Sequence, residues 1–129
     1  MATVGQLMTS QLSTISEDAT IKQAAIYMHT EHIGSLLVKK GEEFSGIITE
    51  TDVVRAVAEK ENVLGISVAQ VMSKPILSVE KKLSPHYARD LMANKRIRHL
   101  AVTDEGKIVG IISARDLLAY FKTISKEVD

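Results

Sequence analysis

Two short stretches of this chain pair a hydroxyl residue with an acid three residues later. They are Gly46–Asp52, with the sequence GIITETD, and Gly110–Asp116, with the sequence GIISARD. In both, the apolar run predicts a buried strand and the hydroxyl residue predicts the start of a helix. A carboxylate in the first turn of a helix can accept two hydrogen bonds from a cis-diol, each worth about 1.5–3 kcal/mol because the acceptor is charged. Free N–H groups at the same helix end suit a phosphate.

The same spacing has a second interpretation, because a hydroxyl residue with an acid three positions later is also a helix capping box. Thr49 with Asp52, and Ser113 with Asp116, could serve only to begin a helix, as such pairs do in many proteins without a ligand. The capping role and the binding role are compatible, so both interpretations stay open.

Both stretches belong to an internal repeat with an offset of 64 residues. The offset aligns residues 3–55 with residues 67–119 without a gap and places Asp52 on Asp116. Other identical pairs include Met8/Met72, Ala24/Ala88, Met28/Met92, Leu36/Leu100 and Gly46/Gly110. The period is longer than that of a solenoid repeat, so it predicts a duplicated half-domain with a pseudo-twofold axis.

Each half of the repeat predicts the same order of elements, β-α-β-β-α. A short helical turn comes first, at residues 3–7 or 67–71, and a short extended piece follows, at residues 12–15 or 76–79. Thr20–Gln23 is a capping box and Ser84 precedes a proline at the first helical position, so a helix is expected after each. Turn residues between β-like runs predict two hairpins, with strands at residues 35–39 and 44–49, and at 99–103 and 107–113.

The pattern predicts a mixed α/β (α+β) fold of two tandem β-α-β-β-α repeats packed sheet to sheet with pseudo-twofold symmetry. One half alone has too few apolar residues to cover both faces of its sheet. The expected boundaries are repeat 1 at residues 1–60, a linker at 61–66, repeat 2 at 67–124 and a tail at 125–129. The last helix of each half is expected to turn its apolar residues inward: Val53, Val54, Val57 and Ala58 in the first, and Leu117, Leu118, Phe121 and Ile124 in the second.

The composition excludes several classes of function. The chain has 129 residues, with 16 basic and 16 acidic side chains and a formal net charge of zero, which gives no reason to expect nucleic acid or an acidic membrane as partner. The absence of cysteine excludes disulfides, thiolate metal sites and cysteine catalysis. No apolar run reaches the ~20 residues of a membrane span, and the N-terminus has no secretion signal, so we expect a cytoplasmic protein.

The repeat resembles the CBS (cystathionine-β-synthase) domain, and residues 3–119 resemble a stand-alone CBS pair, or Bateman module. The resemblance rests on Met8-Thr9 and Met72-Ser73 before a short strand, on the Ala-x-x-x-Met of the first helix, and on the stretches that end in Asp52 and Asp116. It implies a regulatory protein that binds AMP, ADP or ATP in clefts between the repeats, with Mg²⁺ if the ligand is ATP. S-adenosylmethionine and NADH rank behind these ligands.

In the family, the acid after the second hairpin strand accepts hydrogen bonds from ribose hydroxyls, and the hydroxyl residue three positions earlier lies near the ribose and phosphate. The resemblance therefore implies one site at Asp52 and another at Asp116. The residues implied for the first are Asp52, Thr49, Thr51, Gly34, Ser35, Leu12 and Thr14. Those implied for the second are Asp116, Ser113, Arg115, Ala114, Ile112, Arg98, His99, Leu100, Lys74, Ile76 and Ser78.

The two implied sites differ in charge. Four basic residues of the second, Lys74, Arg98, His99 and Arg115, have the uncharged repeat mates Ser10, Gly34, Ser35 and Thr51. We therefore expect the Asp116 site to be the stronger one and to prefer phosphorylated ligands. The Asp52 site is expected to be weaker, adenosine-like or empty.

The sequence gives little support to a metal site or a catalytic site. His29 and His32 lie three residues apart near Glu31, but no third strong ligand is evident, so no metal site is predicted. No nucleophile and base pairing or phosphate-binding loop is present, so we expect no enzyme and no required cofactor. The predicted function is energy-sensing regulation by an adenine nucleotide, with a homodimer and an unidentified effector protein as partners. The alternative is a ligand-free CBS scaffold for dimerisation or protein–protein interaction.

Overall fold

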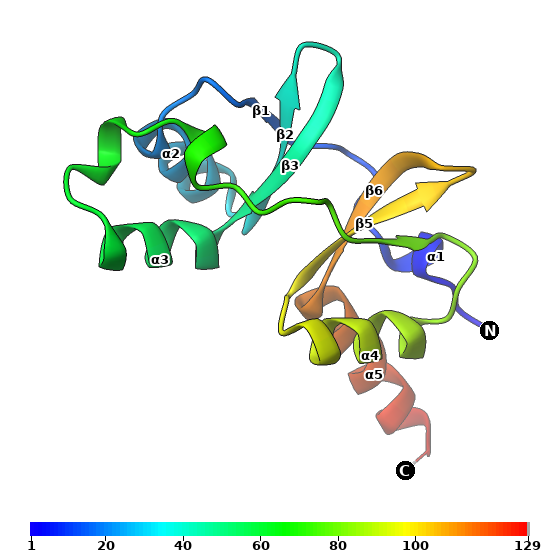
Figure 1. The fold of residues 1–129 in the computed structure, drawn as a ribbon. Helices are drawn as coiled ribbons and strands as arrows, with labels where there is room; N and C mark the ends of the chain where they lie inside the picture. Colours follow the sequence, from blue (N-terminus) through cyan, green and yellow to red (C-terminus); the bar gives the residue numbers. More distant parts are fainter. Residues whose placement is uncertain (129) are drawn as a thin grey trace. The chain divides into compact units, whose positions relative to one another are not determined.

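The computed structural model describes the backbone of residues 1–128 and the side chains of residues 1–125. Its elements follow the predicted order (Figure 1). The helices are α1 (Val4–Leu7), α2 (Ile21–Glu31), α3 (Glu50–Glu59), α4 (Pro85–Lys95) and α5 (Ala114–Val128), with 3₁₀ turns η1 (Val63–Gly65) and η2 (Val68–Gln70). The strands are β1 (Thr14–Ser16), β2 (Ser35–Lys40), β3 (Glu43–Thr49), β4 (Ser78–Glu80), β5 (His99–Asp104) and β6 (Lys107–Ser113). The predicted mixed α/β fold is confirmed; of the expected tail, residues 125–128 belong to α5, and Asp129 lies outside the described residues.

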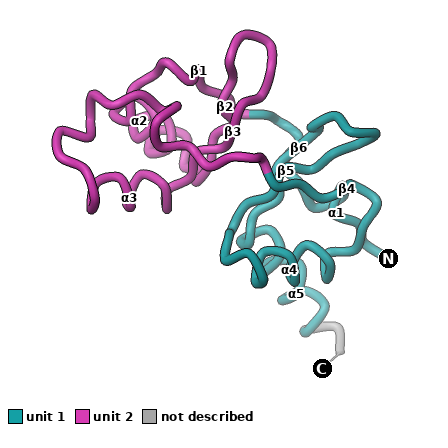
Figure 2. The backbone as a smooth tube through the Cα atoms, in the orientation of Figure 1, with its two compact units in different colours: residues 1–12, 77–129 teal, residues 13–76 magenta. Residues whose placement is uncertain are grey.

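The chain forms two compact units, and each takes residues from both sequence repeats (Figure 2). Unit 1 comprises residues 1–12 and 77–129, and unit 2 comprises residues 13–76. The start of each repeat is thus exchanged. Residues 1–12 join the strands and helices of the second repeat, and residues 61–76 join those of the first.

Each unit contains one three-stranded sheet with the same topology. β1 pairs in parallel with β2, which pairs antiparallel with β3, and β4, β5 and β6 repeat this arrangement. The hairpin register places Ser35 opposite Thr49 in unit 2 and His99 opposite Ser113 in unit 1. The hydroxyl residue of each repeated stretch therefore ends the third strand of its sheet, directly before α3 or α5.

The predicted helix starts are confirmed because local side chains satisfy their first N–H groups. The Thr20 hydroxyl accepts from the Gln23 N–H at 3.1 Å, and the Gln23 side chain accepts from the Thr20 N–H at 2.9 Å. At α4 the Ser84 hydroxyl accepts from the Tyr87 N–H at 3.3 Å, and Pro85 occupies the first helical position, where no N–H is needed. These caps fix where α2 and α4 begin and therefore which face each turns to its sheet.

A close backbone approach holds the exchanged segment 61–76 against the sheet of unit 2. Ser73 and Ile47 exchange two backbone hydrogen bonds, of 2.8 and 3.0 Å. A Cβ on Gly46 would lie 2.9 Å from the Ser73 carbonyl oxygen and 2.7 Å from the Met72 sulfur. Only glycine therefore lets the segment cross β3 this closely.

The exchanged segment 1–12 makes the matching contact in unit 1. Thr9 and Ile111 exchange backbone hydrogen bonds of 2.8 and 3.0 Å, and a Cβ on Gly110 would lie 2.8 Å from the Thr9 carbonyl oxygen and against the Met8 sulfur. The glycine of each repeated stretch and the methionine before each short strand thus belong to one packing contact, made between the two sequence repeats.

Each unit has its own cluster of buried apolar side chains between its sheet and its helices. In unit 2 the cluster comprises Ile21, Ala24, Met28, Leu36, Val38, Ile48, Ala56, Val63, Val68 and Val71. In unit 1 it comprises Val4, Val79, Ala88, Met92, Leu100, Val102, Ile112 and Leu117. Val4 in unit 1, and Val63, Val68 and Val71 in unit 2, come from the exchanged segments, so the exchange contributes to both cores.

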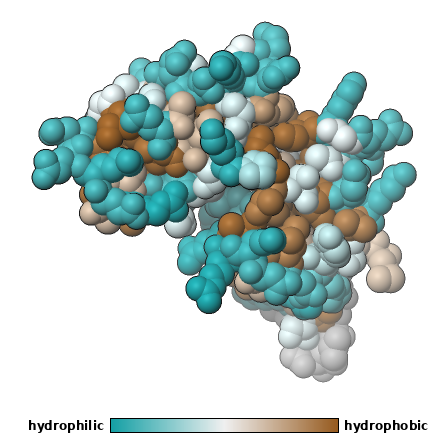
Figure 3. Space-filling view, viewed as in Figure 1, coloured by the Kyte–Doolittle hydropathy of each residue, from teal (hydrophilic) through white to brown (hydrophobic). Residues whose placement is uncertain are grey.

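The expected inward face of the last helices is partly wrong. Val54 and Val57 of α3 are 68% and 56% exposed, and Leu118 of α5 is 70% exposed, whereas Asp52 is buried. The capping box turns Asp52 inward, and a residue two positions later lies about 200° around the helix. The prediction placed Val54 and Val57 on the inner face of α3, which Asp52 and Ala56 occupy instead. On the surface in view, hydrophobic residues lie among hydrophilic ones (Figure 3).

The other residues expected on the inner faces differ in their burial. Ala58 of α3 is exposed, whereas Leu117 of α5 is 4% exposed and lies in the core cluster. Val53 and Phe121 are partly buried and pack against the clusters of their units. The prediction is therefore confirmed for Leu117, holds in part for Val53 and Phe121, and is wrong for Ala58.

Candidate functional site

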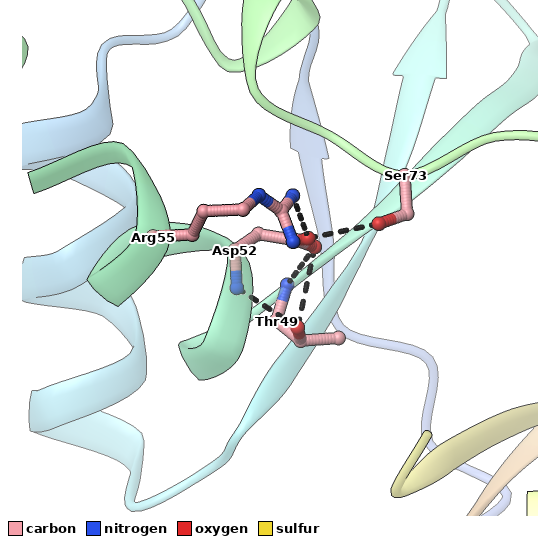
Figure 4. A network of polar contacts seen from close by, with 4 residues as sticks. All are labelled: Thr49, Asp52, Arg55 and Ser73. Atoms are coloured by element: carbon pink, nitrogen blue, oxygen red, sulfur yellow. Dashed lines mark hydrogen bonds and ion pairs between the residues drawn. The ribbon is translucent and has the colours of Figure 1, made fainter. Parts of the chain in front are cut away.

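The carboxylate of Asp52 is the centre of a polar network in unit 2 (Figure 4). The residue lies in the first turn of α3 and is 2% exposed. Its Oδ2 accepts from the Thr49 N–H at 3.0 Å and from the Thr49 hydroxyl at 3.2 Å. Its Oδ1 accepts from Nη2 of Arg55 at 2.7 Å and from the Ser73 hydroxyl at 2.8 Å. Four donors thus converge on one carboxylate.

These contacts give Asp52 a structural role. A buried charge is strongly unfavourable unless it is paired and hydrogen-bonded, and Arg55, Thr49 and Ser73 supply those partners. An ionised carboxylate offers about four lone-pair sites, and the four donors occupy them. The capping box is complete, because the Asp52 N–H also donates to the Thr49 hydroxyl at 3.3 Å. The bond from Ser73 ties the exchanged segment to the start of α3.

Asp116 occupies the matching position in unit 1, and fewer groups hold it. Its Oδ2 accepts from the Ser113 N–H at 2.9 Å, and the Ser113 hydroxyl accepts from the Asp116 N–H at 3.1 Å. The repeat mates of the two extra donors in unit 2 are Ala119, which has no polar side chain, and Thr9, which makes no side-chain hydrogen bond to Asp116. Asp116 is half-buried, and no side chain among the described residues donates to its Oδ1.

Most residues implied for the Asp52 site lie in unit 2. The Gly34 carbonyl accepts from the Glu50 N–H at 3.0 Å, so the residue before β2 lies against the start of α3. Thr51 is exposed on the first turn of α3. The members in unit 2 are Asp52, Thr49, Thr51, Gly34, Ser35 and Thr14, whereas Leu12 lies in unit 1.

Most residues implied for the Asp116 site lie in unit 1. The Arg98 carbonyl accepts from the Ala114 N–H at 2.8 Å, so Arg98 lies beside the start of α5. Leu100 and Ile112 are fully buried in the core cluster, and only their backbone could serve a ligand. The members in unit 1 are Asp116, Ser113, Arg115, Ala114, Ile112, Arg98, His99, Leu100 and Ser78.

Lys74 and Ile76 lie in unit 2, although the repeat register assigned them to the Asp116 site. Lys74 is exposed and follows Ser73, which donates to Asp52. Its repeat mate Ser10 lies in unit 1. The exchange of the first segments thus moves one basic residue to the unit of Asp52, and the basic character of unit 1 near Asp116 rests on Arg98, His99 and Arg115.

Sequence reasoning missed Arg55 and Ser73 as partners of Asp52. Arg55 carried a signal, because an arginine three residues after an aspartate lies on the same helix face, and its repeat mate is an alanine. Ser73 carried none, because it is 21 residues from Asp52 and meets it only through the exchanged segment.

The histidines near the end of α2 line a pocket of unit 2 that does not include Asp52. His29 and His32 line a pocket of about 390 Å³ between α2 and α3, together with Glu50 and the apolar side chains of Ala25, Met28, Ile33, Val53 and Val54. Among the residues that the structure describes, no group of three His, Cys, Asp or Glu side chains is arranged to hold a metal. The pocket therefore gives no support to a metal site.

Comparison with known proteins matches the duplicated architecture. The family model of the CBS domain matches residues 4–59 and residues 68–123. A curated relative, the CBS domain-containing protein YhcV of Bacillus subtilis (strain 168), is 31% identical over 117 residues, which are 91% of this chain and 84% of that protein.

Solved structures share the fold over nearly the whole chain. A putative signal-transduction protein with CBS domains from Burkholderia ambifaria MC40-6 has a TM-score of 0.88 and 31% identity over 93% of both chains. The CBS domain pair of protein MJ0100, solved in complex with 5′-methylthioadenosine and S-adenosyl-L-methionine, covers 95% of this chain and 98% of its own. Its TM-score is 0.84 at 19% identity, a likeness that shows the fold alone.

Proposed function

Because the chain belongs to the CBS domain family, we propose that it is a regulatory module that binds an adenine nucleotide through the carboxylate of Asp116. The observation that carries the proposal is the second oxygen of that carboxylate, Oδ1, which receives no donor from the described side chains. Ser113 holds Oδ2 and thereby fixes the carboxylate in the first turn of α5. A ribose diol supplies the hydroxyl donors that Oδ1 can accept.

The surroundings of Asp116 suit the phosphate of the same ligand. Arg115 is exposed on the first turn of α5, and Arg98 is exposed beside it, at the residue whose carbonyl bonds the Ala114 N–H. Guanidinium groups pair well with phosphate oxygens, and the start of a helix favours negative charge. These cations support a preference for AMP, ADP or ATP over adenosine, with Mg²⁺ accompanying ATP.

The choice of adenine rests on the family and on a protein of the same fold, because no described residue selects the base by itself. The CBS pair of MJ0100 holds two adenosine-containing compounds. We place S-adenosylmethionine after the adenine nucleotides because it has no phosphate for the basic residues beside Asp116, and NADH after them because each of its two phosphates carries a single charge, whereas the phosphate monoester of AMP carries nearly two. The proposed compartment is the cytoplasm, where these nucleotides are abundant ligands.

The proposed output is regulation and not catalysis. A ligand shifts an equilibrium between two arrangements of a protein only by its different affinities for them. The arrangement that AMP favours would then be recognised by an effector protein or by a second copy of the chain. Exposed apolar residues on two helices, Val54, Val57 and Leu118, support a homodimer. No helix in the described part of the chain is long and apolar enough to cross a membrane.

A ligand screen tests the proposal directly. Thermal unfolding and titration calorimetry of the full chain with AMP, ADP, ATP, S-adenosylmethionine and NADH should show the clearest stabilisation with an adenine nucleotide, as expected for a ligand that binds only the folded state. Inosine and guanosine monophosphate serve as matched controls for the base. A chain that responds to no compound at millimolar concentration would reject the sensor and favour the alternative, a ligand-free scaffold.

A further inference from the structure

Arg55 distinguishes the two aspartates of the repeat. We propose that Arg55 is a specificity-determining residue that blocks the Asp52 carboxylate, so that a ribose-containing ligand binds at Asp116 and leaves Asp52 empty. The inference rests on the proposed function, because it assigns which of two equivalent carboxylates the nucleotide takes. The residue at the matching position of the repeat, Ala119, leaves Asp116 open.

Arg55 and a ligand diol compete for the same oxygen atom. The guanidinium donates to Oδ1 of Asp52 at 2.7 Å, and the Asp52 side chain is only 3% exposed beneath it. Guanidinium N–H groups and ribose hydroxyls both approach a carboxylate as donors, and a guanidinium has no acceptor to offer the diol in exchange. The diol must therefore displace Arg55 and break an ion pair before it can bind.

Ser73 also donates to Oδ1 of Asp52, but it is the weaker barrier. A hydroxyl both donates and accepts, so it can turn and stay beside a bound diol. Its segment is held independently, because Ser73 and Ile47 exchange two backbone bonds, as Thr9 and Ile111 do in unit 1. The Arg55 guanidinium is thus the difference between the two units that keeps the ribose hydroxyls of a ligand away from Asp52.

The residues at positions 55 and 119 can be exchanged by mutation, because the two positions match in geometry. Arg55 lies three residues after Asp52 on α3, as Ala119 does after Asp116 on α5. Side chains at this spacing lie on the same helix face and reach each other. The Arg55 side chain is 49% exposed and Ala119 is exposed, so both substitutions change surface groups and not the core.

The experiment is a calorimetric titration of AMP into four full-length proteins: the wild type, Arg55→Ala, Ala119→Arg and the double variant. We expect one AMP per chain for the wild type and two for Arg55→Ala. Ala119→Arg should weaken AMP binding about tenfold or more, because the new guanidinium takes Oδ1 of Asp116. The double variant should bind one AMP at the other aspartate, so that adding Asp52→Asn abolishes its binding and adding Asp116→Asn does not.

The outcomes separate this inference from the proposed function. A wild type that binds two AMP molecules, or an Arg55→Ala variant that still binds one with the wild-type affinity, overturns the role of Arg55 and leaves the proposed function intact. A wild type and an Arg55→Ala variant that both fail to bind AMP at millimolar concentration reject both. If Arg55→Ala does not fold by circular dichroism, Arg55→Gln removes the charge but keeps a polar partner for Asp52, and the Ala119→Arg variant tests the same competition in the other unit.

Discussion

The start of α3 and the start of α5 contain the same capping box, but their aspartates have different surroundings. At Asp52, four donors fill both oxygens of a carboxylate that is almost fully buried. At Asp116, one donor holds Oδ2, and no described side chain donates to Oδ1 of the half-buried carboxylate. The difference comes from residues outside the shared motif, because Arg55 is replaced by Ala119 in the second repeat. The motif therefore predicts where a carboxylate lies, and its neighbours decide whether it is available.

The largest expected effect is on stability and falls on Asp52. Asp52→Ala leaves Arg55, Thr49 and Ser73 without their acceptor and should lower the free energy of unfolding by about 2–4 kcal/mol, less than for a fully buried ion pair because Arg55 is half exposed. Asp116→Ala removes only the capping interaction and should lower it by about 0.5–2 kcal/mol. Urea unfolding of both variants measures the difference. Equal losses would contradict the structural role assigned to Asp52.

Ligand binding should rank the two aspartates in the opposite order. Asp116→Asn is expected to weaken AMP binding about 10- to 100-fold, the loss of a charge-assisted hydrogen bond of about 1.5–3 kcal/mol, whereas Asp52→Asn should change it less than about threefold. The asparagine keeps an acceptor for the Ser113 N–H. As a matched probe, 2′-deoxy-AMP should bind the wild type more weakly than AMP does. On the Asp116→Asn variant, the two nucleotides should bind with almost the same affinity. The ranking fails if both substitutions reduce AMP affinity alike.

Gly46 and Gly110, where the exchanged segments cross β3 and β6, should have the same effect on stability when substituted, in contrast to the two aspartates. Gly46→Ala and Gly110→Ala each bring a Cβ within 3 Å of a carbonyl oxygen in the exchanged segment, so each should lower stability by about 1–3 kcal/mol. Gly65→Ala is the control, because its Cβ would meet nothing within 4 Å and its φ is not positive. Thermal unfolding of the three variants compares them, and a loss in only one unit would show that the exchange is not equivalent in both.

Much of the fold could be predicted because its signals are local. The hairpin strands, the Thr20 capping box and the Ser84-Pro85 helix start depend on side chains within a few residues of one another, and all are confirmed. The contact between Ser113 and Asp116 could also be predicted, because the two residues lie three positions apart at the start of a helix.

The surroundings of the aspartates could not be predicted in the same way. The contact of Ser73 with Asp52 arises only because the segment 61–76 joins the first repeat, and no periodicity encodes that exchange. The same exchange moves Lys74 to the unit of Asp52. On α3, the inner face contains Asp52, an acid that Thr49, Arg55 and Ser73 hold there, so a rule that turns apolar residues inward selects the wrong side for Val54.

A smaller difference is expected from the charge beside each aspartate. Arg115→Thr, which installs the residue of the matching position in the first repeat, should weaken AMP binding about two- to fivefold and leave adenosine binding unchanged, because exposed ion pairs contribute little. The effect should shrink as salt is added. Titrations of AMP and adenosine at two salt concentrations test this, and an equal loss for both ligands would show that Arg115 does not act on the phosphate.

The smallest expected effect concerns the outer faces of the same two helices. Val54→Thr on α3 and Leu118→Gln on α5 should change the stability of dilute protein by less than about 0.5 kcal/mol, because both side chains are mostly exposed. Leu117→Ala is the matched control on the inner face and should cost about 2–4 kcal/mol. If a second copy covers the outer faces, Val54→Thr should destabilise only concentrated protein and shift sedimentation toward the monomer. A loss above 1 kcal/mol in dilute protein would instead mean that Val54 is buried within the folded chain, and that the inward face predicted from its apolar residues is the correct one.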